Sequence, residues 1–229
     1  MKILIIIPAY NEEESIEKVV NDLKQNYSQY DYVIINDGSR DNTSEICHKN
    51  KYKIIDLPVN LGLTGAFQTG LKYAYKKGYD YAIQFDADGQ HLPEYIPAMV
   101  DKIEEGYDMV IGSRFVEKPK PHSLRMLGSR VISTAIKMTT GVHIADPTSG
   151  MRLFNKTLIR EFAENINYEP EPDTVSFLIK QGVKVAEVQV EMKEREAGES
   201  YLNLSRSIVY MTKMFVSIII LQNFRNRKK

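Results

Sequence analysis

Residues 81–91 read YAIQFDADGQH, a stretch in which an apolar run leads directly into an acidic turn. Residues 81–85 are mostly apolar over a length that is typical of a buried strand in a parallel sheet. Asp86 and Asp88 follow, and two carboxylates this close repel each other unless a cation lies between them. The stretch therefore predicts a buried strand that ends at a cation-binding turn.

On both sides of this stretch, apolar runs alternate with segments of helical spacing. The predicted strands, in chain order, are residues 2–7, 32–35, 53–57, 81–85, 108–112 and 183–190. The predicted helices are residues 12–25, 41–49, 64–76, 95–105 and 124–140. Alternation of strand and helix with short links predicts an α/β fold with an open, mostly parallel sheet and helices on both faces.

Polar motifs stand where the first, second and fourth predicted strands end. They are residues 8–12, 36–39 and 86–91. In open α/β sheets, ligands bind at the carboxyl ends of the strands. Hard divalent cations such as Mg²⁺ and Mn²⁺ prefer oxygen ligands and commonly share them with a substrate phosphate. We therefore expect a cation-assisted phosphate site at this edge of the sheet.

Seven motifs, taken in chain order, resemble those of glycosyltransferase family 2. They are residues 8–12 (PAYNE), 36–41 (NDGSRD), 60–66 (NLGLTGA), 86–91 (DADGQH), 112–114 (GSR), 146–152 (DPTSGMR) and Arg195 with 198–200 (GES). The resemblance spans residues 1–205 and is greatest to the group that contains dolichol-phosphate mannose synthase and bacterial polyprenyl-phosphate glycosyltransferases. Each motif alone is modest, whereas seven in the right order are specific.

This resemblance implies a GT-A fold and an inverting, in-line displacement at the anomeric carbon of a nucleotide sugar. The residues that it assigns to the nucleoside are Pro8, Tyr10, Glu12 and Asp37, with Asp86 closing the pocket. Those that it assigns to Mg²⁺ or Mn²⁺ are Asp86, Asp88 and Gln90. The cation would stabilise the charge on the departing nucleoside diphosphate. Two neighbouring polar residues, Asn11 and Ser39, have an alternative role as helix caps.

Further phosphate contacts are implied by arginines outside the acidic turn. Arg114 and Arg125 match positions that contact the acceptor phosphate or the donor diphosphate, and the planar guanidinium suits two phosphate oxygens. Arg195 and Ser200 match a late loop that closes over the diphosphate. Relatives commonly carry Lys after that Ser, whereas this chain has Tyr201, which leaves one phosphate contact in doubt. A solvated basic face is the alternative reading of Arg114.

Residues 169–173 (EPEPD) match the position of the catalytic carboxylate in many family members. A hydroxyl nucleophile needs a general base, whereas a phosphate nucleophile is already ionised near neutral pH. Our hypothesis is that Asp173 is this base if the acceptor is a sugar hydroxyl, with Glu171 as the second candidate. The alternative is an acidic loop that begins a helix.

Composition excludes some other classes of protein. Thirty basic and thirty acidic residues balance, whereas a nucleic-acid-binding protein is normally more basic. The single cysteine, Cys47, excludes an internal disulfide and favours a reducing compartment. The apolar run at 2–7 stops at Pro8, too early for a signal peptide, so we expect no leader.

The last part of the chain differs in character from the rest. Residues 208–221 are strongly apolar with Lys213 among them, and four basic residues follow at 225, 227, 228 and 229. This run is too short and interrupted for a clean membrane span, and it resembles an interfacial helix with a basic anchor. We expect a glycosyltransferase domain at 1–205 and an appendage at 206–229 that meets the inner face of the membrane or a small membrane protein. A core helix with a solvated tail is the alternative, and pairing of 218–221 with a second copy is open.

The predicted function is sugar transfer from a nucleotide sugar, UDP-linked or GDP-mannose, to a polyprenyl phosphate or a lipid-linked glycan in cell-surface polysaccharide synthesis. A sugar-nucleotide nucleotidyltransferase is a rival, but those enzymes carry a glycine-rich basic loop after the first strand, where this chain has residues 8–12 (PAYNE). A catalytically silent subunit that binds nucleotide sugar is a second rival. The intact acidic motifs speak against it.

Overall fold

The structure, a computed structural model, describes residues 1–165, 170–193 and 204–223. Within these ranges one seven-stranded sheet has the order β3-β2-β1-β4-β6-β5-β7. The strands are β1 (Ile3–Ala9), β2 (Asp31–Asn36), β3 (Ile54–Asp56), β4 (Tyr81–Gln84), β5 (Met109–Ser113), β6 (Arg152–Asn155) and β7 (Val185–Gln189). Only β6 runs against its neighbours, β4 and β5. The predicted α/β fold with a mostly parallel sheet is confirmed.

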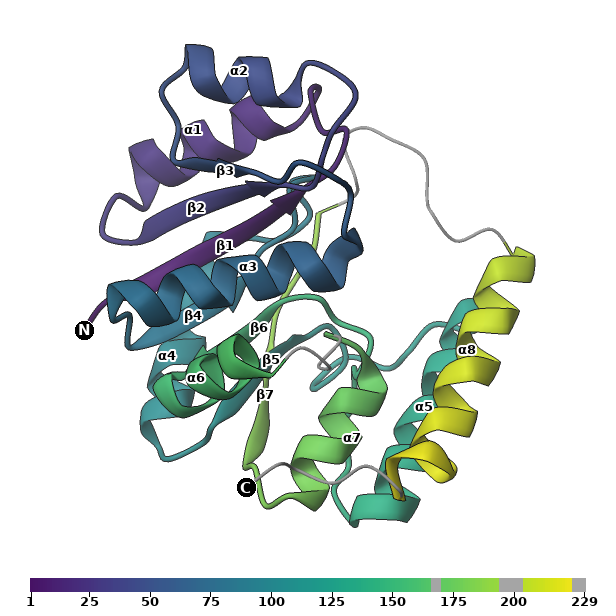
Figure 1. Cartoon of the computed structure of the whole chain (residues 1–229). Coiled ribbons are helices and arrows are strands. Elements are labelled where there is room, and N and C mark those ends of the chain that lie inside the picture. The colour runs from purple at the N-terminus through teal and green to yellow at the C-terminus, as the bar shows by residue number, and fades with distance from the viewer. Residues whose placement is uncertain (166–169, 194–203, 224–229) are drawn as a thin grey trace.

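Helices cover both faces of this sheet (Figure 1). They are α1 (Ile16–Asn26), α2 (Thr43–Lys49), α3 (Gly62–Lys77), α4 (Ile96–Glu104), α5 (Leu124–Thr140), α6 (Lys156–Glu164), α7 (Pro172–Lys180) and α8 (Leu204–Ile219), with short 3₁₀ helices η1 (Pro93–Tyr95) and η2 (Leu221–Asn223). Six strands and five helices were predicted close to these bounds. β6 and α6 were not predicted, and the start of α7 was predicted only as the alternative reading of residues 169–173.

Strand β1 is buried on both faces, so its side chains divide between two cores. Ile5 and Ile7 pack with α1, α2 and α4, whereas Leu4 and Ile6 pack on the opposite face with α3 and α6. Such burial on both faces explains why this strand reads as a continuous apolar run rather than an alternating one. Figure 1 shows α1 and α2 on one side of strands β1–β3 and α3 on the other.

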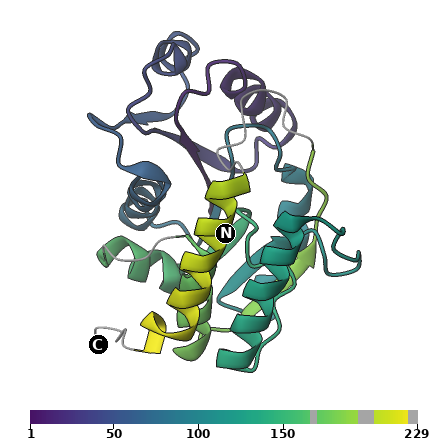
Figure 2. The same ribbon diagram turned by 90° about the vertical axis from the view of Figure 1, so that its right-hand side faces the viewer.

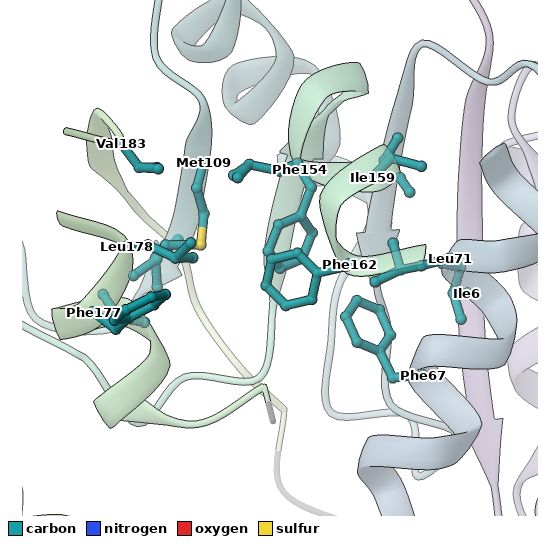
Figure 3. Packing of buried hydrophobic residues seen from close by; sticks show 14 of the residues in the cluster. Ile6, Phe67, Leu71, Met109, Phe154, Ile159, Phe162, Phe177, Leu178 and Val183 are labelled. Atoms are coloured by element: carbon teal, nitrogen blue, oxygen red, sulfur yellow. The ribbon is translucent and has the colours of Figure 1, made fainter. Parts of the chain in front are cut away.

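β6, α6 and α7 contribute side chains to the core that lies on the α3 side of the sheet (Figure 3). The ring of Phe154 on β6 lies 5.7 Å from that of Phe67 on α3 and 5.3 Å from that of Phe162 on α6, measured between centroids. Phe177 and Leu178 of α7 are buried in the same cluster. Aromatic rings at these separations add to the stabilisation from burial. The antiparallel strand is therefore fixed by the helices that follow it.

Helix α8 lies along α5 and also contacts α7 (Figures 1 and 2). Its side chains Met214 and Ile218 are buried in the core that contains Phe154 and Phe177. In the ranges that the structure describes, no helix has the length and apolar character needed to cross a bilayer. The apolar stretch that was predicted at 208–221 is thus mostly helical and packs against α5 and α7. The helix begins at Leu204, about one turn before the predicted start.

The reversed direction of β6 matters for the site. Because β6 is antiparallel to β4 and β5, it begins at the edge where those strands end. Arg152, its first residue, pairs in register with Gln84 near the end of β4. The loop at residues 146–151 therefore lies at the same edge of the sheet as the acidic turn. The described motifs that follow β1, β2, β4 and β5, and the one that precedes β6, therefore lie at this edge.

Candidate active site

The loops that follow β1 and β2 are joined to each other by side-chain hydrogen bonds. The backbone N–H of Asn11 donates to Ser39 Oγ (3.0 Å), and Asn11 Oδ1 accepts from the backbone of Arg40 (2.9 Å). Asn11 has φ 58°, a left-handed conformation that asparagine tolerates better than most residues. Neither Asn11 nor Ser39 caps a helix, so the alternative reading of these residues is wrong.

Asp37, at the end of β2, is buried and fixes the turn that precedes α3. Its Oδ1 accepts a hydrogen bond of 2.7 Å from the backbone of Leu61. Gly38 follows with φ 67°, and a Cβ there would lie 2.9 Å from the backbone nitrogen of Asn60. Only glycine satisfies both the positive φ and this close approach. Two of the recognised motifs are therefore packed directly against each other.

The remaining residues assigned to the nucleoside lie at the end of β1 and on the segment that follows it. Pro8, Tyr10 and Glu12 are half-buried. Glu12 is held by its neighbours, because its Oε2 accepts from Ser15 Oγ (2.7 Å) and its backbone N–H donates to Thr43 Oγ1 (2.8 Å). These three residues and Asp37 thus share one edge of the sheet, as expected from the strand assignment.

His91, which the sequence reasoning did not assign, holds the acidic turn. The backbone N–H of Asp86 donates to His91 Nδ1 at 2.9 Å, so the ring hydrogen of a neutral His91 lies on Nε2. That Nε2 is 3.4 Å from Asp86 Oδ2. The ring is buried and meets Phe85 edge-on, with 5.4 Å between centroids. The histidine therefore orients the carboxylate of Asp86, whose side chain is 37% exposed.

Gly150 lies against the side chains of Asp86 and His91. A Cβ at Gly150 would lie 3.3 Å from Asp86 Oδ2 and 3.5 Å from His91 Cε1. Asp88 is buried, and its Oδ1 accepts from the backbone of Gln90 at 3.0 Å. Gln90 in turn exchanges backbone and side-chain hydrogen bonds with the backbone of Lys193. Segments from β4, β6 and β7 therefore converge on one pair of carboxylates.

These residues suit a divalent cation whose remaining ligands come from the substrate and from water. Among the residues that the structure describes, no cluster of three or more His, Cys, Asp or Glu side chains forms a self-contained metal site. Mg²⁺ is usually held by about one or two carboxylates, with substrate phosphates and waters supplying the rest. Asp86 and Asp88 would supply those carboxylates, and the missing side chain of Gly150 leaves space beside Asp86. A cavity of about 390 Å³ adjoins Asp88 on its α1 side.

Arg114 lies at this edge, but its guanidinium is engaged within the protein. Its Nε and Nη2 donate to the two carboxylate oxygens of Asp146 at 2.7 and 2.9 Å. Asp146 is fully buried and also accepts from Thr148 Oγ1 (3.1 Å). This bidentate pair excludes the alternative of a solvated basic side chain for Arg114. A phosphate contact by Arg114 stays a prediction and would use the part of the guanidinium that faces away from Asp146.

Arg152 is a buried cation that the sequence reasoning included in a motif without giving it a role. Its guanidinium is 3% exposed and donates to the carbonyl oxygens of Pro147 and Ser149, both at 2.9 Å. Burial lowers the pKa of Arg152, and the nearby charge of Glu171 opposes this most strongly. Arg152 therefore supports the backbone of the loop that carries Gly150.

The two candidate bases lie at the start of α7 and are hydrogen-bonded to the C-terminal helix. Glu171 Oε2 accepts from the hydroxyl of Tyr210. Asp173 Oδ2 accepts from Ser217 Oγ at 2.7 Å and from Gln222 Nε2 at 3.0 Å. Arg195 and Ser200 lie outside the described residues, as does the side chain of Arg125.

Comparison with known proteins places this geometry in a family. Residues 4–162 match the model of glycosyl transferase family 2. A UDP-N-acetylglucosamine–dolichyl-phosphate N-acetylglucosaminyltransferase of Methanococcus voltae is 34% identical over 213 residues, 82% of this chain and 84% of the relative. An undecaprenyl-phosphate mannosyltransferase of Micrococcus luteus is 28% identical and 93% of each chain is covered.

Solved structures show the same fold. The glucosyl-3-phosphoglycerate synthase of Mycobacterium tuberculosis, crystallised with Mn²⁺, UDP-glucose and phosphoglyceric acid, superposes with a TM-score of 0.72 at 17% identity. The match covers 99% of this chain and 81% of the synthase. The expected GT-A architecture is confirmed, and the protein is a member of glycosyltransferase family 2.

Proposed function

We propose that this protein transfers a sugar from a nucleoside-diphosphate sugar to a polyprenyl-type lipid phosphate in a reaction that depends on a divalent cation. The observation that carries the proposal is the oriented Asp86–Asp88 pair, with Gly150 against it, at the edge where the family motifs meet. The names of the relatives from M. voltae and M. luteus, which both specify a polyisoprenoid phosphate acceptor, support this acceptor class.

Asp86 and Asp88 would hold Mg²⁺ or Mn²⁺, with Gln90 as the third predicted ligand. When bound, such a cation neutralises negative charge that develops on the leaving diphosphate. The glucosyl-3-phosphoglycerate synthase of M. tuberculosis was crystallised with UDP and Mn²⁺ and also with UDP and Mg²⁺, which supports a divalent cation here. His91 keeps Asp86 aimed at the site through the two contacts of its ring.

The donor nucleoside would lie between the segment that follows β1 and the Asp37 turn. Pro8 and Tyr10 offer apolar surface, and the carboxylates of Glu12 and Asp37 can accept hydrogen bonds from a base or ribose. A UDP-sugar is favoured by the name of the M. voltae relative, whereas other relatives carry mannose in their names. Arg195 and Ser200 would close over the diphosphate.

The acceptor decides what the α7 carboxylates do. A lipid phosphate is ionised near neutral pH and attacks without a general base. Asp173, or Glu171 in second place, would therefore act as a base only if the acceptor were a sugar hydroxyl. Arg114 and Arg125 would guide the anionic acceptor, for which the fixed donors of a guanidinium are suited.

The C-terminal part would bring the protein to the inner face of the membrane. Helices α5 and α8 lie side by side (Figure 2). Both expose large apolar side chains, which are Leu127, Val131 and Met138 on α5 and Val209, Phe215 and Val216 on α8, with Ile220 directly after α8. The sequence ends in a basic tail that anionic lipid would attract. A small membrane protein is the alternative partner of this surface, with residues 206–229 as the associating segment.

A transfer assay tests the proposal. Purified protein with Mn²⁺ is incubated with vesicles that contain undecaprenyl phosphate and with UDP-N-acetylglucosamine, UDP-glucose or GDP-mannose in turn. We expect one donor to give a lipid-linked sugar, and we expect EDTA or Asp88→Asn to abolish it. Tight nucleotide-sugar binding without product from any donor would instead indicate a catalytically silent subunit.

A further inference from the structure

The carboxylate of Asp56 joins three elements where β2 and β3 end. Asp56 is the last residue of β3, and its Oδ1 accepts from Asn36 Nδ2 (2.7 Å) at the end of β2 and from Ser44 Oγ (2.8 Å) on α2. His48 Nε2, also on α2, lies 2.7 Å from Oδ2 of the same carboxylate. Strand β3 lies at the edge of the sheet and pairs with β2 through three residues. Side-chain contacts to Asp56 therefore supplement a short backbone ladder.

Asn36 connects Asp56 to the turn that carries Asp37. The Asn36 side chain is buried, donates to Asp56 and accepts through Oδ1 from the backbone N–H of Ser39 at 3.2 Å. Its backbone carbonyl accepts from the N–H of Leu57 at 2.9 Å. Because both ends of the side-chain amide are hydrogen-bonded, its orientation is determined. The two ends of the 36–39 turn are thus held together on either side of Asp37.

The same turn is bound to the segment that follows β1. Ser39 Oγ accepts from the backbone N–H of Asn11 (3.0 Å), and Asn11 Oδ1 accepts from that of Arg40 (2.9 Å). Thr43 Oγ1, at the start of α2, accepts from the backbone N–H of Glu12 at 2.8 Å. An unbroken series of hydrogen bonds therefore runs from the end of β3 to both segments that are assigned to the nucleoside.

A second carboxylate joins β2 and β3 at their other ends. Asp31, the first residue of β2, accepts from Lys53 Nζ (2.8 Å), directly before β3, and from the hydroxyl of Tyr79 (3.1 Å). The side chains of Asp31 and Asp56 are 47% and 37% exposed. The two carboxylates therefore make comparable contacts between the same strands, but only Asp56 lies at the edge of the sheet where the motifs meet.

We propose that Asp56 is a positioning residue for the nucleotide, which acts through Asn36 to hold the 36–39 turn, and Asp37 with it, in the conformation that binds the nucleoside. The inference rests on the proposed use of a nucleotide sugar, whose base or ribose would donate to Asp37. Loss of the Asp56 contact would let the turn occupy conformations that cannot bind. The apparent Kd then rises as the binding-competent fraction falls.

Nucleotide affinity separates this role from a general effect on stability. We expect Asp56→Ala to raise the Kd for UDP or GDP with Mn²⁺, each titrated in a calorimeter, about tenfold, because only a minority of molecules then have an ordered turn. Asp31→Ala removes the matched carboxylate. It should lower Tm by a similar amount and leave the Kd within about twofold of wild type. Equal losses of affinity in the two variants, or a wild-type Kd in Asp56→Ala, would overturn the inference.

An exchange of the two side chains tests the contact itself. Asn36→Asp alone places two carboxylates where a hydrogen bond was, so it should weaken nucleotide binding at least as much as Asp56→Ala. In the double variant Asn36→Asp/Asp56→Asn, one amide again faces one carboxylate, and an acceptor for the N–H of Ser39 is kept. We expect its Kd to return to within about threefold of wild type. A double variant that binds as weakly as Asn36→Asp would contradict the proposal.

The transfer reaction divides the effect between two kinetic constants. In Asp56→Ala the KM for the nucleotide sugar should rise, whereas kcat at saturating donor should stay within about twofold of wild type. The reason is that the acidic turn follows β4, which is separated from β2 and β3 by β1. A lower kcat with an unchanged KM would overturn the inference, because Asp56 would then act on the chemical step.

Hydrogen exchange makes the test independent of nucleotide binding. Amides of residues 37–40 should exchange faster in Asp56→Ala than in wild type, and should be unchanged in Asp31→Ala. Unchanged exchange at 37–40 in Asp56→Ala would refute the inference even if wild type bound no nucleotide. Faster exchange there, in a protein that binds neither UDP nor GDP, would uphold the positioning contact and count against the proposed donor.

Discussion

At the scale of single residues, the Arg114–Asp146 pair is a bidentate ion pair that is partly buried at the site. Nε and Nη2 of Arg114 meet both oxygens of a fully buried carboxylate. The resemblance pointed to Arg114 as a phosphate ligand, and the sequence held no sign that Asp146, 32 residues later, would pair with it. Spacing along a chain shows which side chains share an element, but it does not show which ones meet across a sheet edge.

Even a conservative substitution of Arg114 should therefore reduce the stability of the folded protein. Lysine cannot reproduce the two parallel hydrogen bonds, so Arg114→Lys should leave Asp146 poorly satisfied and lower the free energy of unfolding by about 1–3 kcal/mol. Urea unfolding measures this. Arg160→Lys, in an exposed pair with Glu164, should leave the free energy of unfolding essentially unchanged. If the two variants changed the free energy of unfolding equally, the burial of Asp146 would make no difference to the stability that its ion pair contributes.

His91 and Arg152 show what residue-level prediction could and could not reach. Both lie within motifs that the resemblance singled out, so position alone marked them. Their roles depend on contacts that only the fold reveals: the His91 ring against Asp86, and the Arg152 guanidinium against two loop carbonyls. Asn11 and Ser39 looked like helix caps for the same reason, since their true partners lie about 28 residues away on another loop.

At the scale of elements, the packing of α3 on β1 depends on a glycine. A Cβ at Gly70 would lie 2.2 Å from Ile6 Cγ2, a side chain with no exposed surface. Gly70→Ala should gain about 1 kcal/mol in helix propensity and lose about 1–3 kcal/mol or more to overpacking. We expect net destabilisation in urea. Lys72→Ala, at an exposed position of the same helix, is the control and should be near neutral. A stabilised Gly70→Ala variant would contradict the close contact.

Asp56 connects α2 to the ends of β2 and β3 and should shape stability at acid pH. Its carboxylate accepts from Asn36 Nδ2 (2.7 Å), Ser44 Oγ (2.8 Å) and His48 Nε2 (2.7 Å). Burial opposes the charged form, but these hydrogen bonds outweigh it and hold the pKa of Asp56 below its ordinary value.

The direction of the pH effect follows from this lowered pKa. The unfolded state binds the proton more readily, so the stabilisation is complete above the unfolded carboxyl pKa of about 3.9 and is lost as pH falls through the lower folded pKa. Asp56→Asn should therefore lose stability less steeply than wild type as the pH is lowered from 5 to 3. Urea unfolding across this range measures the slope, with the exposed Asp101→Asn as control. Parallel acid limbs for wild type and Asp56→Asn would refute the assignment.

Helices and strands of the first half followed from the sequence, whereas β6, α6 and α7 did not. Strands buried on both faces produce apolar runs, and amphipathic helices produce a repeating pattern, so both kinds of element are visible. β6 begins with Arg152 and ends with Asn155, so it holds only two apolar residues and no apolar run marks it in the sequence. α7 begins at Pro172 after alternating Glu and Pro, a composition that resembles a loop although Pro suits the first turn of a helix.

At the scale of the whole molecule, the sheet collects motifs that are far apart in the chain. Parallel strands end at a common edge, which is why strand placement alone predicted where a ligand would bind. The reversed β6 adds the 146–151 loop to that edge, a feature that the alternation pattern did not predict. The identity of the sugar depends on contacts that no pattern in the sequence encodes, so the donor has to be found by assay.

The proposed function requires Asp86 and Asp88 to bind a divalent cation together with the diphosphate of a nucleotide sugar. A crystal soaked with UDP and MnCl₂, measured at the manganese absorption edge, tests this most directly. We predict one anomalous peak within coordination distance of Asp88 and of a diphosphate oxygen, with the uracil near Asp37. A manganese ion or diphosphate bound away from both carboxylates would contradict the account.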